Sequence, residues 1–144
     1  MSAKLIIKNI IIFALILLWV YAAMSKLMDF NMFRGQMHRQ VLPLIFKTTL
    51  AYVLPPVELL TAILLLFDRS RLLGFYVSFG LIGAFTIYVG LAVFRFFDKV
   101  PWSCGGIMSS MGWETHFIFN LSFLLLTATG LAIQYRERRS IQRV

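Results

Sequence analysis

The longest uncharged run in the chain reads LLGFYVSFGLIGAFTIYVGLAVF and covers residues 72–94. A membrane-spanning helix needs about 20 predominantly apolar residues, so this run is long enough to cross a bilayer. Three further apolar stretches occur at about residues 9–28, 48–67 and 113–135. Backbone groups in hydrocarbon must bond within their own segment, and none of the stretches alternates polar and apolar residues as a barrel strand does. The sequence therefore predicts an all-α fold, a polytopic four-helix membrane bundle that forms a single domain over residues 1–144.

The composition excludes an ordinary soluble domain. Of the 144 residues, 60% are hydrophobic and 14% are charged, and the mean hydropathy is +0.82. Soluble domains are about 45–50% apolar and about 25% charged. The single cysteine excludes an intramolecular disulfide and a multi-cysteine metal cage. We therefore interpret the net charge of +8 as topology signals and lipid headgroup contacts, and we expect no nucleic-acid partner.

The basic residues outside the spans predict an orientation. With both termini in the cytoplasm, the inner side carries positive residues in short tails and one tight turn: Lys4, Lys8, Arg69, Arg71, Arg136, Arg138, Arg139 and Arg143. The outer loops, residues 29–47 and 95–112, carry fewer positive residues, diluted by acidic ones. Short membrane-adjacent segments weigh most in the positive-inside rule. We therefore expect a multi-pass protein that is N-in and C-in, with a basic cytoplasmic tail at residues 136–144.

A cleavable signal peptide is the alternative interpretation of the N-terminus. Lys4 and Lys8, an apolar run and the small residues Ala22, Ala23 and Ser25 fit that pattern. The apolar run is long for a signal peptide, whose apolar core has about 7–15 residues, so we favour a first membrane span.

Glu58 is an ionisable residue near the middle of the second span. A carboxylate at that depth is expected to be protonated, paired or facing a water-filled cleft. Pro55 and Pro56 precede it, and two prolines are expected to break the helix and start a new turn at about Pro56. A proton-handling or ligand-binding role and a structural hydrogen bond to a neighbouring helix both remain open for Glu58.

Lys26 and Asp29 close the first span. They are three residues apart, so they share a helix face and can pair with each other. Lys26 at the interface and a simple helix stop are the plainer interpretation. A second interpretation makes Lys26 the counter-ion of Glu58, reached from the outer end of the bundle.

The chemical focus of the second outer loop is the segment Pro101-Trp102-Ser103-Cys104-Gly105-Gly106. Two glycines after the cysteine allow close approach of another chain, and a thiol near a helix start can have its thiolate stabilised. A lone membrane cysteine is nevertheless usually inert. Thiol–disulfide turnover within one protein needs a second cysteine, which this chain lacks.

The fourth span begins with a polar face. Trp113, His116 and Asn120 are spaced so that they lie on one side of a helix. His116 could orient or deprotonate a thiol, relay protons or bind a quinone carbonyl. Alternatively, Asn120 bonds across helices and His116 lies in the wet interface. A metal site is not expected, because His38 and His116 are in separate segments without ligand spacing.

The order of these features resembles the DoxX-like membrane superfamily, and within it the MauE branch of redox-associated proteins. Ser25 to Phe30 resembles the family's lysine–aspartate signature, and Leu54 to Glu58 resembles its proline–glutamate helix. Pro101 to Gly106, followed by Trp113, His116 and Asn120, resembles its cysteine-loop and fourth-helix block. The resemblance implies a bundle similar in plan to vitamin K epoxide reductase. It also implies a bacterial inner membrane location and a periplasmic Cys104 loop that supports disulfide formation with thioredoxin-like helpers.

The chain departs from the family pattern at Trp102, where relatives commonly carry a first cysteine. Cys104 alone can form only a mixed disulfide with a partner, which argues against an autonomous dithiol oxidoreductase. The first hypothesis is an accessory protein that supports periplasmic thiol or electron chemistry and partner maturation. In that hypothesis Cys104, His116 and Glu58 act chemically and Trp102 docks the partner. The sequence does not fix a cofactor, and a quinone is the candidate.

The alternative hypothesis is a non-enzymatic assembly subunit of a larger membrane complex that has lost the second thiol. A small transporter or channel is disfavoured, because the span at 72–94 offers few polar side chains and no inverted repeat is apparent.

Overall fold

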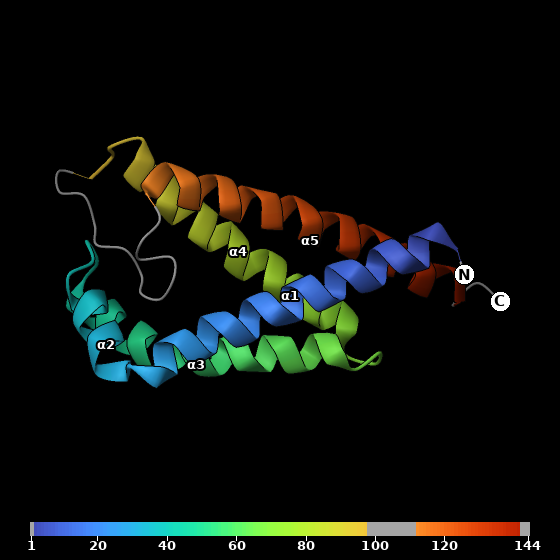
Figure 1. Cartoon of the computed structure of the whole chain (residues 1–144), viewed down its shortest axis with the longest axis horizontal. Helices are drawn as coiled ribbons and strands as arrows, with labels where there is room; N and C mark the ends of the chain where they lie inside the picture. Colours follow the sequence, from blue (N-terminus) through green and yellow to red (C-terminus); the bar gives the residue numbers. More distant parts are fainter. Residues whose placement is uncertain (1, 98–111, 142–144) are drawn as a thin grey trace.

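A computed structural model describes residues 2–97 and 112–141 of the chain. Within this part the elements are α1 (Ala3–Met28), α2 (Phe30–His38), α3 (Leu44–Leu66), α4 (Arg71–Val93) and α5 (Trp113–Ile141). Four of these helices, α1, α3, α4 and α5, are long and apolar enough to cross a membrane. Figure 1 shows α1 and α3 together on one side of the bundle and α4 and α5 on the other. The all-α four-span architecture expected from the sequence is confirmed.

The membrane helices extend beyond the expected apolar spans. α1 begins at Ala3 rather than near residue 9, and α3 begins at Leu44 rather than near residue 48. The expected basic tail at 136–144 is helical as far as Ile141. Arginine and glutamate are good helix formers, and Glu137 in this extension forms an ion pair with Lys8 of α1. Hydropathy detects only the part of a helix that lies in hydrocarbon, so a helix can extend beyond its expected span at either end.

The expected outer loop at 29–47 contains a short helix, α2, that the sequence analysis did not predict. The Asp29 side chain caps it by accepting a hydrogen bond from the backbone N–H of Met32, at 3.0 Å. Phe33 and Met37 lie one turn apart on its buried face and pack with Ala51 and Leu54 of α3. α2 therefore closes one end of the bundle.

The prolines do not interrupt α3, contrary to the expectation of a broken helix. The helix is continuous from Leu44 to Leu66 with Pro55 and Pro56 inside it. Proline fixes φ at a value compatible with an α-helix, although it removes the N–H that would bond four residues back. Membrane helices tolerate this loss because neighbouring groups can satisfy the freed carbonyls. Glu58 thus stands on a regular helical turn.

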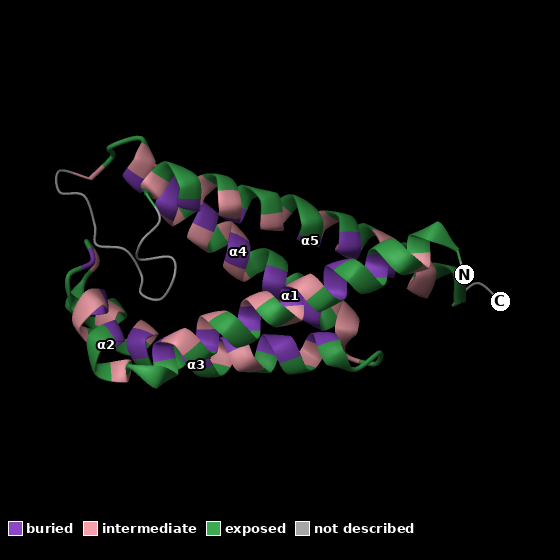
Figure 2. Ribbon diagram, in the orientation of Figure 1, coloured by how far each residue is buried: buried purple, intermediate pink, exposed green. Residues whose placement is uncertain are grey.

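The core of the bundle runs along the facing sides of the four long helices. Trp19, Leu15, Leu65 and Phe75 are almost completely buried and belong to one apolar cluster. Figure 2 shows buried residues along the inner stripes of the helices and exposed residues on the outer faces. The outer faces carry large apolar side chains such as Phe13, Ile87 and Leu125, as expected for helices surrounded by lipid.

The two chain termini lie at the same end of the bundle, and α2 lies at the opposite end (Figure 1). The C-terminal end of α4 and the start of α5 are also at the α2 end (Figure 1). Both termini lie at one end because the chain passes through the length of the bundle four times.

Candidate functional site

A cavity of about 330 Å³ lies inside the bundle, lined by residues from α1 to α5 and by the link after α2. We call it the central cavity. Its walls are mainly apolar and include Leu18, Leu54, Leu81, Ile82, Phe85 and Val89. Its polar side chains are Lys26, Gln40, Glu58, Tyr88, His116 and Asn120, with the indole groups of Trp19 and Trp113. Small-molecule sites are commonly cavities of about 300–1,000 Å³ with apolar walls and a few convergent polar groups.

An ion pair between Lys26 and Glu58 forms one side of the central cavity. The Lys26 ammonium nitrogen is 2.9 Å from Glu58 Oε1 and 3.2 Å from Oε2. It also donates to the carbonyl oxygen of Ala22 at 3.0 Å, so acceptors surround all of its hydrogens. Only 1% of Glu58 is exposed. The pair joins α1 to α3. Of the two interpretations of Lys26 given above, the structure has the one in which Lys26 is the counter-ion of Glu58.

Helix periodicity places this pair inward. Leu54, Glu58, Thr61 and Leu65 recur every three or four residues and form the buried face of α3. Ala22 and Lys26 are one turn apart on α1, which brings the lysine within reach of the Ala22 carbonyl. Asp29 is not part of the pair, because its side chain caps α2 and does not line the central cavity.

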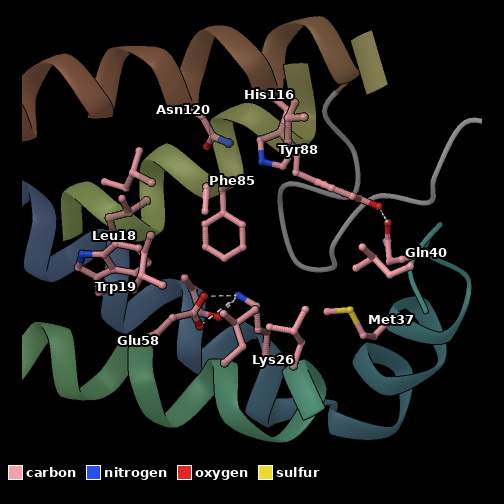
Figure 3. A pocket seen from close by; sticks show the side chains of 18 of the residues that line it. Leu18, Trp19, Lys26, Met37, Gln40, Glu58, Phe85, Tyr88, His116 and Asn120 are labelled. Carbon is pink, nitrogen blue, oxygen red and sulfur yellow. Dashed lines mark hydrogen bonds and ion pairs between the residues drawn. The ribbon is translucent and has the colours of Figure 1, made fainter. Parts of the chain in front are cut away.

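The opposite side of the central cavity is formed by α5. Trp113, His116 and Asn120 line it together, as their spacing predicted. His116 and Asn120 are 7% and 8% exposed. Figure 3 shows both side chains projecting from α5 toward Phe85 and the interior. The amide nitrogen Nδ2 of Asn120 is enclosed and has no hydrogen-bond partner.

Tyr88 and Gln40 form a polar contact at the α2 end of the central cavity. The Tyr88 hydroxyl donates to Gln40 Oε1 at 2.7 Å, which joins α4 to the link after α2 (Figure 3). The sequence pattern predicted a site role for neither residue. Tyr88 is one of four residues with a hydroxyl group in the span at 72–94, and nothing in its spacing distinguishes it from the others. Gln40 lies outside any periodic pattern. The only feature of the sequence that could have indicated the contact is the residue type of Tyr88, because a buried tyrosine hydroxyl usually has a hydrogen-bond partner.

Trp19 forms a second polar contact between helices that the sequence pattern did not predict. Its indole N–H donates to Ser78 Oγ at 2.8 Å and joins α1 to α4. This bond fixes the indole ring at the inner boundary of the central cavity, where the apolar core begins.

The remaining predicted site residues, Trp102, Cys104, Gly105 and Gly106, lie outside the described part of the chain. The structure therefore brings together Lys26, Glu58, Trp113, His116 and Asn120 from three helices and leaves Asp29 apart.

The geometry combines a buried ion pair, an imidazole and a free amide around an apolar space. The two charges of Lys26 and Glu58 compensate each other, so this side of the cavity is electrically balanced. An imidazole can donate and accept a proton at its two ring nitrogens. The arrangement can therefore bind a small molecule through hydrogen bonds and exchange protons with it.

Comparison with known proteins finds one family. The family model described as methylamine utilisation protein MauE matches residues 4–133. No curated protein and no solved structure matches the chain. The matched range contains all but the first residue of α1, the whole of α2, α3 and α4, most of α5 and every described residue that lines the central cavity.

Proposed function

The chain belongs to the MauE family, and from this membership we propose that it is a membrane accessory protein that supports thiol or electron chemistry during maturation of a partner. The partner class that fits is a periplasmic thioredoxin-like protein or a component of a membrane complex. The name of the family points to methylamine utilisation as the setting. We propose the bacterial inner membrane as the location, with both termini in the cytoplasm.

The central cavity is the observation that carries this proposal. An imidazole, a buried amide with an unpaired nitrogen and an ion pair converge on this one space. Intramembrane ionisable residues are rare and mark functional sites more often than structural ones. Trp113 lines the cavity and is nine positions after Cys104 in the chain, so the proposed thiol and the cavity are close in sequence.

In this proposal Cys104 is the thiol that contacts the partner. Its thiolate attacks a disulfide of the partner, one new sulfur–sulfur bond forms, and the second sulfur of that disulfide leaves as a thiolate. A different thiol of the partner then attacks the mixed disulfide at the partner's sulfur, which forms a new disulfide within the partner and releases Cys104 as a thiolate. His116 accepts the thiol proton, and Glu58 balances Lys26 beside the cavity. Trp102 docks the partner, and Gly105 and Gly106 allow its chain to approach closely.

The test uses the fact that Cys104 is the single cysteine of the sequence. Membranes containing the protein are treated with a thiol-alkylating reagent and separated without reductant. We expect a reducible adduct, whose partner mass spectrometry identifies, and its loss in the Cys104→Ser variant. Ser103→Ala is the matched control and should retain the adduct. Full partner maturation in Cys104→Ser membranes would remove thiol chemistry from the function.

A non-enzymatic assembly role is the second candidate. The observation in its favour is Trp102 at the position where a dithiol protein would carry its other cysteine. This role predicts co-purification in a complex of fixed stoichiometry that Cys104→Ala leaves intact. The adduct experiment above separates the two candidates, because only the thiol role requires the sulfur.

A further inference from the structure

The end of the bundle that carries the chain termini is strongly basic (Figure 1). In the described part of the chain, the acidic residues at this end are Asp68 and Glu137. Asp68 pairs with Arg71, and Glu137 pairs with Lys8. Five further cations form no ion pair within residues 2–97 and 112–141, namely Lys4, Arg69, Arg136, Arg138 and Arg139. This end of the bundle therefore attracts anions.

Two of these five cations meet beside the turn that joins α3 to α4. The Arg138 guanidinium of α5 donates a hydrogen bond to the backbone carbonyl of Arg69 in that turn. The Arg69 side chain is exposed and makes no hydrogen bond or ion pair within the described residues. The nearby Arg71 is already occupied, because its guanidinium contacts Asp68 and two carbonyl oxygens at the end of α3. An anion beside this turn can therefore accept hydrogen bonds from both Arg69 and Arg138, each of which has donors to spare.

These two arginines lie at the depth of lipid headgroups. Leu66 and Phe67, immediately before the turn, are 59% and 58% exposed, as expected for side chains in contact with acyl chains. On α5, the exposed Tyr135 has its ring centre 5.9 Å from the Arg139 guanidinium. Tyrosine is enriched where a membrane meets water. The hydrocarbon therefore ends close to Phe67 and Tyr135, and the two arginines follow within three residues.

We infer that Arg69 and Arg138 bind the phosphate of an anionic phospholipid of the adjoining leaflet. Its acyl chains lie along Leu66 and Phe67. A guanidinium binds a phosphate through two parallel hydrogen bonds and remains charged at physiological pH. A zwitterionic headgroup carries its own cation, so it gains less from a surface on which both acids are already paired.

A lipid fits this surface better than a water-soluble anion does. An acidic protein or a nucleic acid reaches the charges from the water side but gains nothing from the apolar side chains beside them. The bound lipid joins the α3–α4 turn to α5. This lipid site is separate from the central cavity, and it does not depend on the proposed thiol chemistry.

The experiment measures which lipids stay bound to the full-length protein. The protein is placed in nanodiscs that contain phosphatidylglycerol and phosphatidylcholine in equal amounts and with identical acyl chains. Native mass spectrometry then counts the lipids that remain bound after release. We expect the wild-type protein to retain phosphatidylglycerol in preference to phosphatidylcholine. Arg69→Gln and Arg138→Gln should each lower this preference about fivefold, the effect of one cation at a membrane surface, and the double variant should abolish it.

Arg136→Gln is the matched control. Arg136 is exposed on the same helix and has the same charge, but it is two residues from Arg138 and so projects from another side of α5. Its replacement should change the lipid preference less than twofold. An equal loss in Arg136→Gln and Arg69→Gln would mean a diffuse positive surface and would overturn the site.

Three further results would also overturn it. These are equal retention of the two lipids, an unchanged preference in Arg69→Gln, and displacement of phosphatidylglycerol by excess inorganic phosphate, which would mean a site for free anions. If Arg138→Gln or the double variant does not fold, the comparison of Arg69→Gln with Arg136→Gln decides alone, because both side chains are exposed.

Discussion

The carboxylate of Glu58 is buried in the middle of a membrane helix and is held there by one lysine. Lys26 reaches it from α1 at 2.9 Å, and Phe33 lies with its ring centre 5.7 Å from the ammonium nitrogen. A buried ion pair of this kind gains little over a well-packed apolar pair, because both ions lose their hydration. Removal of only Lys26 or only Glu58 destabilises the fold more strongly, because the other charge then remains buried without a partner. The pair therefore acts as a unit.

A double-mutant cycle tests this coupling. Lys26→Met and Glu58→Leu alone should each lower the free energy of unfolding by about 3–5 kcal/mol, because each leaves an uncompensated buried ion. The double variant should recover most of this loss, since two apolar side chains of similar volume replace the pair. The measurement is denaturant or thermal unfolding of the purified protein in detergent.

Lys4→Met is the control for this cycle, because Lys4 is exposed on α1 and its replacement should change stability by less than about 0.5 kcal/mol. Additive losses in the double variant would contradict the coupling.

Asn120 gives a second prediction at the same scale. An enclosed amide without a partner costs about 1–3 kcal/mol relative to an apolar group of the same shape. Asn120→Leu should therefore raise the melting temperature of the protein. If the Asn120 side chain instead stabilises the fold, Asn120→Leu should lower the melting temperature. Differential scanning calorimetry of the purified protein in detergent measures the change.

Residue type and spacing predicted about half of this site. The shared face of Trp113, His116 and Asn120 follows from helix periodicity, and the structure places all three on the central cavity. The Lys26–Glu58 contact was one of two open interpretations, because sequence gives the depth of a residue but not its neighbouring helix. The bond from Tyr88 to Gln40 could not be predicted, since it depends on how the link after α2 folds back over α4.

At the scale of the helices, close packing depends on positions where no side chain fits. A Cβ atom added at Gly74 of α4 would lie 2.9 Å from the backbone nitrogen of Leu65. A Cβ added at Gly130 of α5 would lie 2.5 Å from the ring of Phe75. Small residues at such points allow membrane helices to approach each other. The α3–α4 and α5–core contacts are therefore set by glycine.

Gly74 and Gly80 on α4 form a matched pair for testing this. Gly74→Ala should lower the free energy of unfolding by about 1–3 kcal/mol, because the backbone of α3 cannot move away cheaply. Gly80→Ala should be neutral or stabilising by up to about 1 kcal/mol, since nothing lies within 4 Å of its added Cβ and alanine is the better helix former. Equal effects of the two changes in an unfolding experiment would contradict the packing argument.

The four long helices were predictable because each has a charge-poor core of sufficient length. α2 was not, because its nine residues are too short and too mixed in polarity to give a span signal. The continuous α3 was also mispredicted, because local proline rules carry less weight where neighbouring helices hold the chain. Local signals therefore failed where tertiary contacts decide the structure.

Within residues 2–97 and 112–141, the interior of the bundle is packed at one end and hollow at the other. Toward the termini, a cluster that includes Leu15, Leu65 and Phe75 fills the interior, and Lys8 pairs with Glu137. Toward α2, the interior opens into the central cavity. In the described part of the chain, this apolar cluster separates the polar groups of the cavity from the terminal end. Such an arrangement suits a site that is reached from one face or from the lipid.

Labelling of single cysteines tests on which side of the membrane the α2 end of the bundle lies. The termini gather at one end of the bundle, while α4 ends and α5 begins at the other (Figure 1), so Cys104 and Ser2 should be on opposite sides of the membrane. A membrane-impermeant maleimide should label wild-type Cys104 in right-side-out spheroplasts. A Cys104→Ser protein that also carries Ser2→Cys should be labelled only in inverted vesicles. The mirror-image result would reverse the orientation and move the thiol to the cytoplasm, which contradicts a periplasmic partner. Labelling of both positions from one side would contradict four spans.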